Sequence, residues 1–121
     1  MTETILYSRN GHVGSIMLNN PARHNALGRE QLDAIQGYLN QIVAERQVRV
    51  LVLSGAGDKT FCAGASLQEL SSGQLGDDAF QDVTAQLADL AIPTICVLNG
   101  DVFGGGVELA ASCDFRIEVE G

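Results

Sequence analysis

Two glycine-rich stretches of the chain decide its fold: FCAGASL at residues 61–67 and NGDVFGGGVEL at residues 99–109. Each stretch is followed by a pattern that predicts a helix. The first backbone N–H groups of a helix have no partner inside the helix, and they attract negative charge. Two such groups directed at one oxygen atom would form an oxyanion hole. Glu108 would then lie one turn into the second helix, where an acid or base is needed.

The residues before these stretches predict a hairpin, a helix and a strand. The pair Asn10-Gly11 separates two apolar runs, 5–7 and 13–18, which is typical of a β-hairpin, and Pro21 follows its end. A β-branched run over 48–54 predicts a buried strand. Between them we expect a helix over 29–46, because apolar residues recur there at steps of three and four, namely Leu32, Ile35, Leu39 and Ile42.

The second half continues the alternation of strands and helices. Ser66 and Glu69 have the spacing of a capping box, so a short helix is expected to begin at Leu67 and to end at 71–73. The pattern further predicts a helix from about Asp77 to Leu90, a strand over 94–98, a helix over 105–113 and a strand over 115–119. Such alternation implies crossover units and an α/β architecture, which we assign to a single domain over residues 1–121.

Composition narrows the class of protein further. The formal net charge of −8 argues against a nucleic-acid partner or an anionic membrane surface. The sequence has neither the apolar length of a membrane span nor the start of a secretory signal. Three widely spaced cysteines fit a reducing compartment and are interpreted as core residues. His12 and His24 are isolated, so we expect no metal site. These features predict a soluble, cytoplasmic protein.

The ordered set of motifs resembles the enoyl-CoA hydratase/isomerase (crotonase) superfamily. The matching pieces are NNP at 19–21, NAL at 25–27, FCAGA at 61–65, GGGVELA at 104–110 and CD at 113–114. The resemblance covers nearly the whole chain but only the N-terminal part of a typical member. It implies a crotonase-like spiral of ββα units with two roughly perpendicular sheets, without the family's C-terminal helical region.

The resemblance also implies a substrate and a set of site residues. The substrate is an acyl-CoA thioester, and coenzyme A is carried as part of it with no other cofactor. By motif position, the N–H groups of Ala65 and Gly105 hold the thioester oxygen, and Glu108 helps to activate the water added to a 2-enoyl-CoA. The residues expected to bind the rest of the substrate are Ala22, Arg23, Asn25, Ala26, Leu27, Ala63, Gly64 and Gly104.

The sequence departs from the family pattern in two respects. Many members have aspartate where this chain has Ser66, but serine can also cap a helix. The second glutamate of typical hydratases lies beyond Gly121, as does the helical region that builds the family's trimers. We therefore expect a truncated core, and a homo-oligomer (trimer or hexamer) if the full-length chain is longer.

Several interpretations stay open at the level of sequence. Within the superfamily the chain could be a hydratase, an isomerase, a decarboxylase or a thioester hydrolase. It could also be a non-catalytic module that binds acyl-CoA or a partner. The position of Glu108 before an apolar run favours a partly buried carboxylate over a solvated one. Arg23 and His24 fit either a solvated loop or contacts with CoA phosphates.

Three further residues receive structural interpretations. Cys62 is expected in the core rather than as a nucleophile, because no histidine is near it in the sequence. Asp58 is expected in a polar loop with Lys59. Asp114 is expected to support the junction between a helix and a strand.

Overall fold

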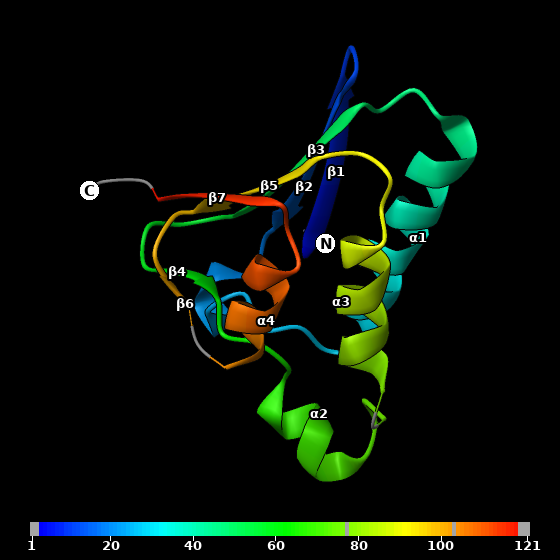
Figure 1. Cartoon of the computed structure of the whole chain (residues 1–121). Helices are drawn as coiled ribbons and strands as arrows, with labels where there is room; N and C mark the ends of the chain where they lie inside the picture. Colours follow the sequence, from blue (N-terminus) through cyan, green and yellow to red (C-terminus); the bar gives the residue numbers. More distant parts are fainter. Residues whose placement is uncertain (1–2, 77, 103, 119–121) are drawn as a thin grey trace.

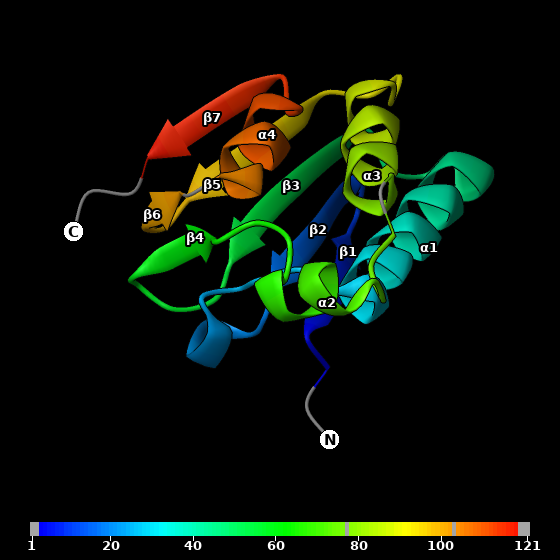
Figure 2. The same ribbon diagram turned by 90° about the horizontal axis from the view of Figure 1, so that it is seen from below.

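The computed structural model describes residues 3–76, 78–102 and 104–118, and it contains two parallel or mixed sheets with helices packed against them. Figures 1 and 2 show α1, α3 and α4 on the same face of the larger sheet. In chain order the elements are β1 (Ile5–Asn10), β2 (Val13–Leu18), the 3-10 helix η1 (Pro21–Arg23), α1 (Arg29–Glu45), β3 (Val50–Gly55), β4 (Thr60–Cys62), α2 (Leu67–Ser72), α3 (Ala79–Ala88), β5 (Thr94–Leu98), β6 (Asp101–Val102), α4 (Gly105–Ala111) and β7 (Phe115–Glu118).

The larger sheet has the strand order β1-β2-β3-β5-β7. β1 and β2 form the expected antiparallel hairpin, and every later pair in this sheet is parallel. The hairpin loop consists of Gly11 and His12, one residue later than the expected Asn10-Gly11, because Asn10 still pairs with Val13. Gly11 has φ 63°, the left-handed conformation that a tight hairpin loop requires. The α/β prediction is therefore confirmed, including its crossover units.

Two amphipathic helices close the core over this sheet. The residues that predicted α1 are all buried, from Leu39 at 0% to Ile42 at 3% exposed. In α3, Phe80, Val83 and Leu87 are buried as well. Both helices end slightly earlier than expected: Arg46 caps α1 in the left-handed conformation, and α3 ends at Ala88, before the predicted Leu90. Asp77, the predicted start of α3, lies outside the described residues.

The smaller sheet consists of β4 and β6, which pair in parallel. Apart from Thr60, both segments belong to the two glycine-rich stretches, in which no strand was expected. They are three and two residues long, too short for any periodicity to identify. Their pairing brings the two stretches side by side, so this sheet determines the position of the candidate site (Figure 2).

The last strand, β7, forms as expected and is exposed to solvent. β7 pairs with β5, but all four of its residues are exposed, including Phe115 at 60% and Ile117 at 53%. Its predicted final residue, Val119, lies outside the described residues. Asp114, just before it, has the expected structural role, since its Oδ2 accepts the N–H of Thr94 at 2.9 Å. Within the described ranges, no helix is long and apolar enough to cross a membrane.

Candidate active site

The first glycine-rich stretch is joined by backbone hydrogen bonds to the segment before α1. A parallel bridge joins Leu27 to Ala65: Leu27 donates to the carbonyl of Gly64 at 2.8 Å, and Ser66 donates to the carbonyl of Leu27 at 2.9 Å. In such a bridge the N–H of the opposite residue points away from its partner. The N–H of Ala65 therefore points away from Leu27, and it has no recorded acceptor among the described residues.

The second glycine-rich stretch lies directly against the first. Gly64 has φ 93°, and a Cβ added to it would lie 2.8 Å from the backbone nitrogen of Gly105. A Cβ on Gly106 would overlap the carbonyl oxygen of Cys62. Gly105 is the first residue of α4, where an N–H has no acceptor within the helix. Glycine at these positions lets the backbone donors of the two stretches approach closely.

One cavity of about 290 Å³ opens at this contact. Five residues expected at the site line it together: Ala63, Ala65, Gly104, Gly105 and Glu108. Its other lining residues were not identified from the sequence and come from α2, from the loop after it and from α3: Leu67, Leu70, Leu75, Gly76, Phe80 and Gln81. Leucine at 67 and 70 was visible in the sequence, but nothing there indicated that α2 faces the glycine-rich stretches.

Glu108 differs from its expectation in one respect. The residue lines the cavity from the first turn of α4 but is exposed, not partly buried. The buried face of α4 consists of Gly106, Leu109 and Ala110, whereas Val107 beside Glu108 is 52% exposed. The apolar residues after Glu108 therefore pack away from its carboxylate, and that pattern misled the prediction.

Asn25 and Leu27 support the site from within. Both are 1% exposed. The Asn25 amide donates to the carbonyls of Thr60 and Phe61 at 3.0 and 3.1 Å, and its Oδ1 accepts the N–H of Asn20 at 2.7 Å. These bonds tie the segment before α1 to β4. The side chains of Asn25 and Leu27 are therefore withdrawn from any ligand. These two residues contribute to binding by positioning the backbone around them.

The remaining expected binding residues lie around neighbouring cavities. Arg23 and Ala26 line a cavity of about 800 Å³ near the start of α1, and Ala22 lines one of about 310 Å³ with Lys59. His24 lines a third of about 630 Å³, which also includes Ala63. Ala63 thus borders both this cavity and the one that contains Glu108. Among the described residues, this third cavity shares a lining residue, Ala63, with the candidate site.

Cys62 is buried beneath the first glycine-rich stretch, as expected of a core residue. Burial raises the pKa of its thiol to about 11, against a smaller opposing effect of the Gly64 N–H, which donates to Sγ at 3.3 Å. At neutral pH the thiol is protonated, so it is a poor nucleophile.

The raised pKa of Cys62 predicts a change of stability at alkaline pH. The thiol of the unfolded chain ionises near 9.0 and that of the folded chain near 11. Its contribution to stability is thus complete below pH 9 and is lost as the pH rises toward 11. We expect the free energy of unfolding, measured with urea between pH 8 and about 11, to fall less steeply in Cys62→Ala than in the wild type. Equal slopes would contradict the assignment.

Comparison with known proteins gives the family of this chain. The family model for enoyl-CoA hydratase/isomerase matches residues 8–120. This chain belongs to the enoyl-CoA hydratase/isomerase family and has the crotonase-like fold. The resemblance stated from the motifs is thereby confirmed.

Individual relatives support the same assignment. YngF from Bacillus subtilis, which carries the same family name, is 39% identical over 99% of this chain and 48% of its own length. The short-chain-enoyl-CoA hydratase of Clostridium acetobutylicum is 33% identical over 93% of this chain and 45% of its own. An enoyl-CoA hydratase structure from Bacillus anthracis superposes with TM-score 0.89 at 35% identity, over 96% of this chain and 47% of that one. The chain spans about half the length of the relatives it matches.

Proposed function

We propose that this chain supplies the thioester-binding and water-activating groups of an enzyme that hydrates a 2-enoyl-CoA. One observation carries the proposal: the N–H of Ala65 and the first N–H of α4 belong to backbones in contact, and both residues line one cavity with Glu108. A cavity with two backbone donors and one carboxylate suits a reaction in which negative charge develops on a carbonyl oxygen.

The chemistry follows from where the charge develops. Water adds to the β-carbon of the enoyl thioester, and the electron pair of the double bond moves toward the thioester oxygen. The N–H groups of Ala65 and Gly105 stabilise that oxygen, and one such donor is worth roughly 2.7–4 kcal/mol of activation free energy. The Glu108 carboxylate accepts a proton from the attacking water, which contributes about 10²–10⁴-fold in rate. Return of this proton to the α-carbon of the enolate completes the addition and gives the 3-hydroxyacyl thioester. A side-chain nucleophile is not needed.

Two features favour hydration over the other reactions of the superfamily. The Glu108 carboxylate is exposed, so water reaches it freely. Relatives from Clostridium acetobutylicum and Syntrophomonas wolfei are named as short-chain-enoyl-CoA and crotonyl-CoA hydratases. An isomerase uses the same donors to shift the double bond, and it remains the alternative for this chain.

A product assay tests the proposal and separates the alternatives. The protein is purified from its native source, its intact mass is measured, and it is incubated with crotonyl-CoA. We expect loss of the ultraviolet absorbance of the conjugated thioester and a product heavier by one water molecule. A double-bond shift at unchanged mass would establish the isomerase instead. Binding of the thioester without turnover would overturn the proposed enzyme and support a binding module.

A further inference from the structure

One wall of the candidate cavity is formed by α2 and the loop after it. Leu67 and Leu70 of α2 line the cavity together with Leu75. α2 contains no buried residue, and its two leucines are 79% and 48% exposed. An isolated helix of six residues is unstable in water. Leu75 is 1% exposed and holds the loop in the core, whereas the position of α2 itself must depend on other contacts.

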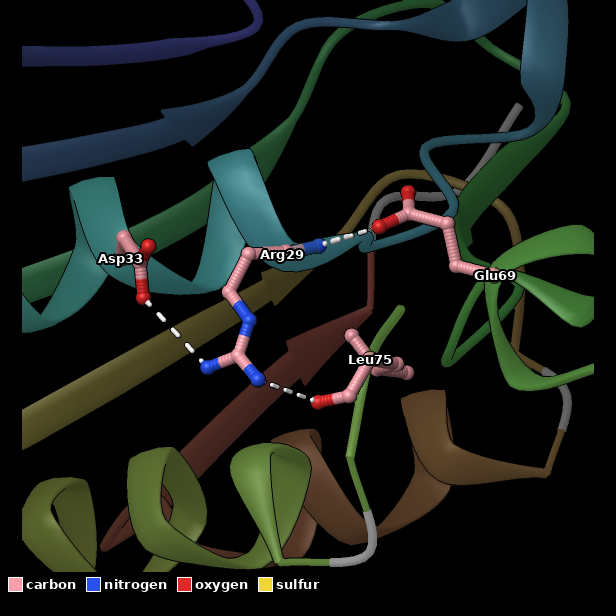
Figure 3. A network of polar contacts seen from close by, with 4 residues as sticks. All are labelled: Arg29, Asp33, Glu69 and Leu75. Carbon is pink, nitrogen blue, oxygen red and sulfur yellow. Dashed lines mark hydrogen bonds and ion pairs between the residues drawn. The ribbon is translucent and has the colours of Figure 1, made fainter. Parts of the chain in front are cut away.

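Polar contacts with the start of α1 hold α2 in place (Figure 3). The Oε1 atom of Glu69, in α2, accepts the backbone N–H of Arg29 at 2.9 Å. The Nη2 atom of Arg29 donates to the carbonyl of Leu75 at 2.9 Å. The N–H of Leu75 in turn donates to the carbonyl of Glu69 at 3.4 Å. These bonds join α2, its following loop and α1 in one closed set of contacts.

The start of α1 is suited to receive the Glu69 carboxylate. The N-cap residue, Gly28, has no side chain that could bond to the first turn, and its own N–H donates to Oε1 of Gln31 at 2.9 Å. A Cβ on Gly28 would overlap the Glu69 carboxylate. A negative charge at the N-terminus of a helix is favourable, here a helix of 17 residues. Glu69 thus provides, from α2, the acceptor that the N-cap residue of α1 lacks.

This arrangement corrects the expected capping box of α2. Ser66 does cap α2, since its Oγ accepts the N–H of Glu69 at 3.4 Å. The reciprocal half is absent: the N–H of Ser66 donates to Leu27, and the Glu69 carboxylate bonds to Arg29. The spacing therefore identified the start of the helix correctly, while the glutamate acts between two helices.

We propose that Arg29 and Glu69 form a clamp that positions α2, and that Glu69 is thereby a positioning residue for the acyl group of the substrate. That an acyl group occupies the cavity follows from the proposed function, and this part of the inference rests on it. When the clamp is lost, Leu67 and Leu70 move relative to the backbone donors. Contacts along the acyl chain then weaken, whereas the chemistry at the thioester is unchanged. The clamp therefore acts on KM and on preference for acyl length.

Four variants separate the clamp from its surroundings. Glu69→Ala removes the acceptor, and Glu69→Gln keeps a side-chain oxygen at the same reach. Arg29→Ala keeps the backbone N–H that Glu69 uses and removes only the contact with Leu75. Asp33→Asn is the matched control: Asp33 lies 4.0 Å from the same guanidinium group, both side chains are about half exposed or more, and among the described residues no hydrogen bond or ion pair joins Asp33 to α2.

Hydrogen exchange of residues 66–76 tests the clamp without any need for turnover. In Glu69→Ala we expect this segment to exchange about tenfold to hundredfold faster, because a hydrogen bond to a charged group is lost. Arg29→Ala should show a smaller increase confined to 73–76. Asp33→Asn should exchange like the wild type. Glu69→Gln keeps the acceptor but loses the charge at the N-terminus of α1, so its exchange should lie between that of the wild type and that of Glu69→Ala. Unchanged exchange in Glu69→Ala overturns the inference, whatever the enzyme activity.

Kinetics with 2-enoyl-CoA substrates of increasing length tests the positioning role. We expect Glu69→Ala to raise KM for the longer substrates about tenfold, with kcat within about twofold of the wild type. The reason is that the conformation in which α2 lines the cavity is less populated. Glu69→Gln, which keeps the acceptor oxygen, should bring KM back toward the wild-type value. Faster exchange with an unchanged KM at every length would overturn the positioning role. A wild-type protein without turnover is a different result: it refutes the proposed function, while exchange still decides the clamp.

Discussion

Replacing Glu108 with glutamine is expected to lower kcat for crotonyl-CoA hydration by about 10²–10⁴-fold, the contribution of a positioned acid or base. Glutamine has nearly the same shape but cannot accept a proton from water. Because Glu108 is exposed in the first turn of α4, its substitution leaves no buried group without a partner. KM should change little, since the thioester oxygen is bound by backbone donors. Initial rates from the loss of enoyl absorbance measure both constants.

Glu30→Gln is the matched control for this variant. Glu30 is also an exposed glutamate in the first turn of a helix, so its replacement removes the same charge from a helix N-terminus. It does not line the cavity that contains Glu108. Its kcat should equal that of the wild type. If the two variants lose activity equally, net charge rather than proton transfer explains the loss, and the role assigned to Glu108 is wrong.

Helix periodicity was the part of the fold that could be predicted reliably from the sequence. The apolar positions of α1 and α3 lie in the core because a helix buries residues at steps of three and four. The β4–β6 pair could not be predicted in this way. Its strands are far apart in the chain, and what pairs them is the approach of two glycine-rich backbones, which leaves no periodic signal.

The candidate site could likewise be predicted only in part from the sequence. The resemblance to the family implied that Ala65, Gly105 and Glu108 share one site, and all three line the same cavity. The exposure of Glu108 and the contact between Glu69 and Arg29 depend on how α4 and α2 are oriented against other elements. Capping preferences describe one helix at a time, whereas Glu69 bonds to a helix 40 residues earlier in the chain. Tertiary geometry thus changed the roles of residues that the local patterns had identified.

Gly64→Ala is expected to lower kcat/KM for crotonyl-CoA by at least about 10²–10³-fold, the effect of losing one oxyanion donor. The physical reason lies in the contact between the two glycine-rich stretches. An alanine Cβ would approach the Gly105 nitrogen to 2.8 Å, closer than real Cβ atoms do, and the backbone at Gly64 has φ 93°, which alanine adopts only with strain. To relieve the contact, the stretches must separate, and the N–H groups of Ala65 and Gly105 then no longer converge on one oxygen.

Stability must be separated from catalysis in this experiment, because the same strain costs about 1–3 kcal/mol. Gly37→Ala is the control, since Gly37 is exposed in the middle of α1 and a Cβ there meets nothing within 4 Å. It should stabilise the protein by about 0.8–1.0 kcal/mol and leave kcat/KM unchanged. Rates are compared per folded molecule, with the folded fraction taken from urea denaturation. A Gly64→Ala protein that is folded and turns over at the wild-type rate would show that the two backbones need not touch for catalysis, and would refute the paired-donor site.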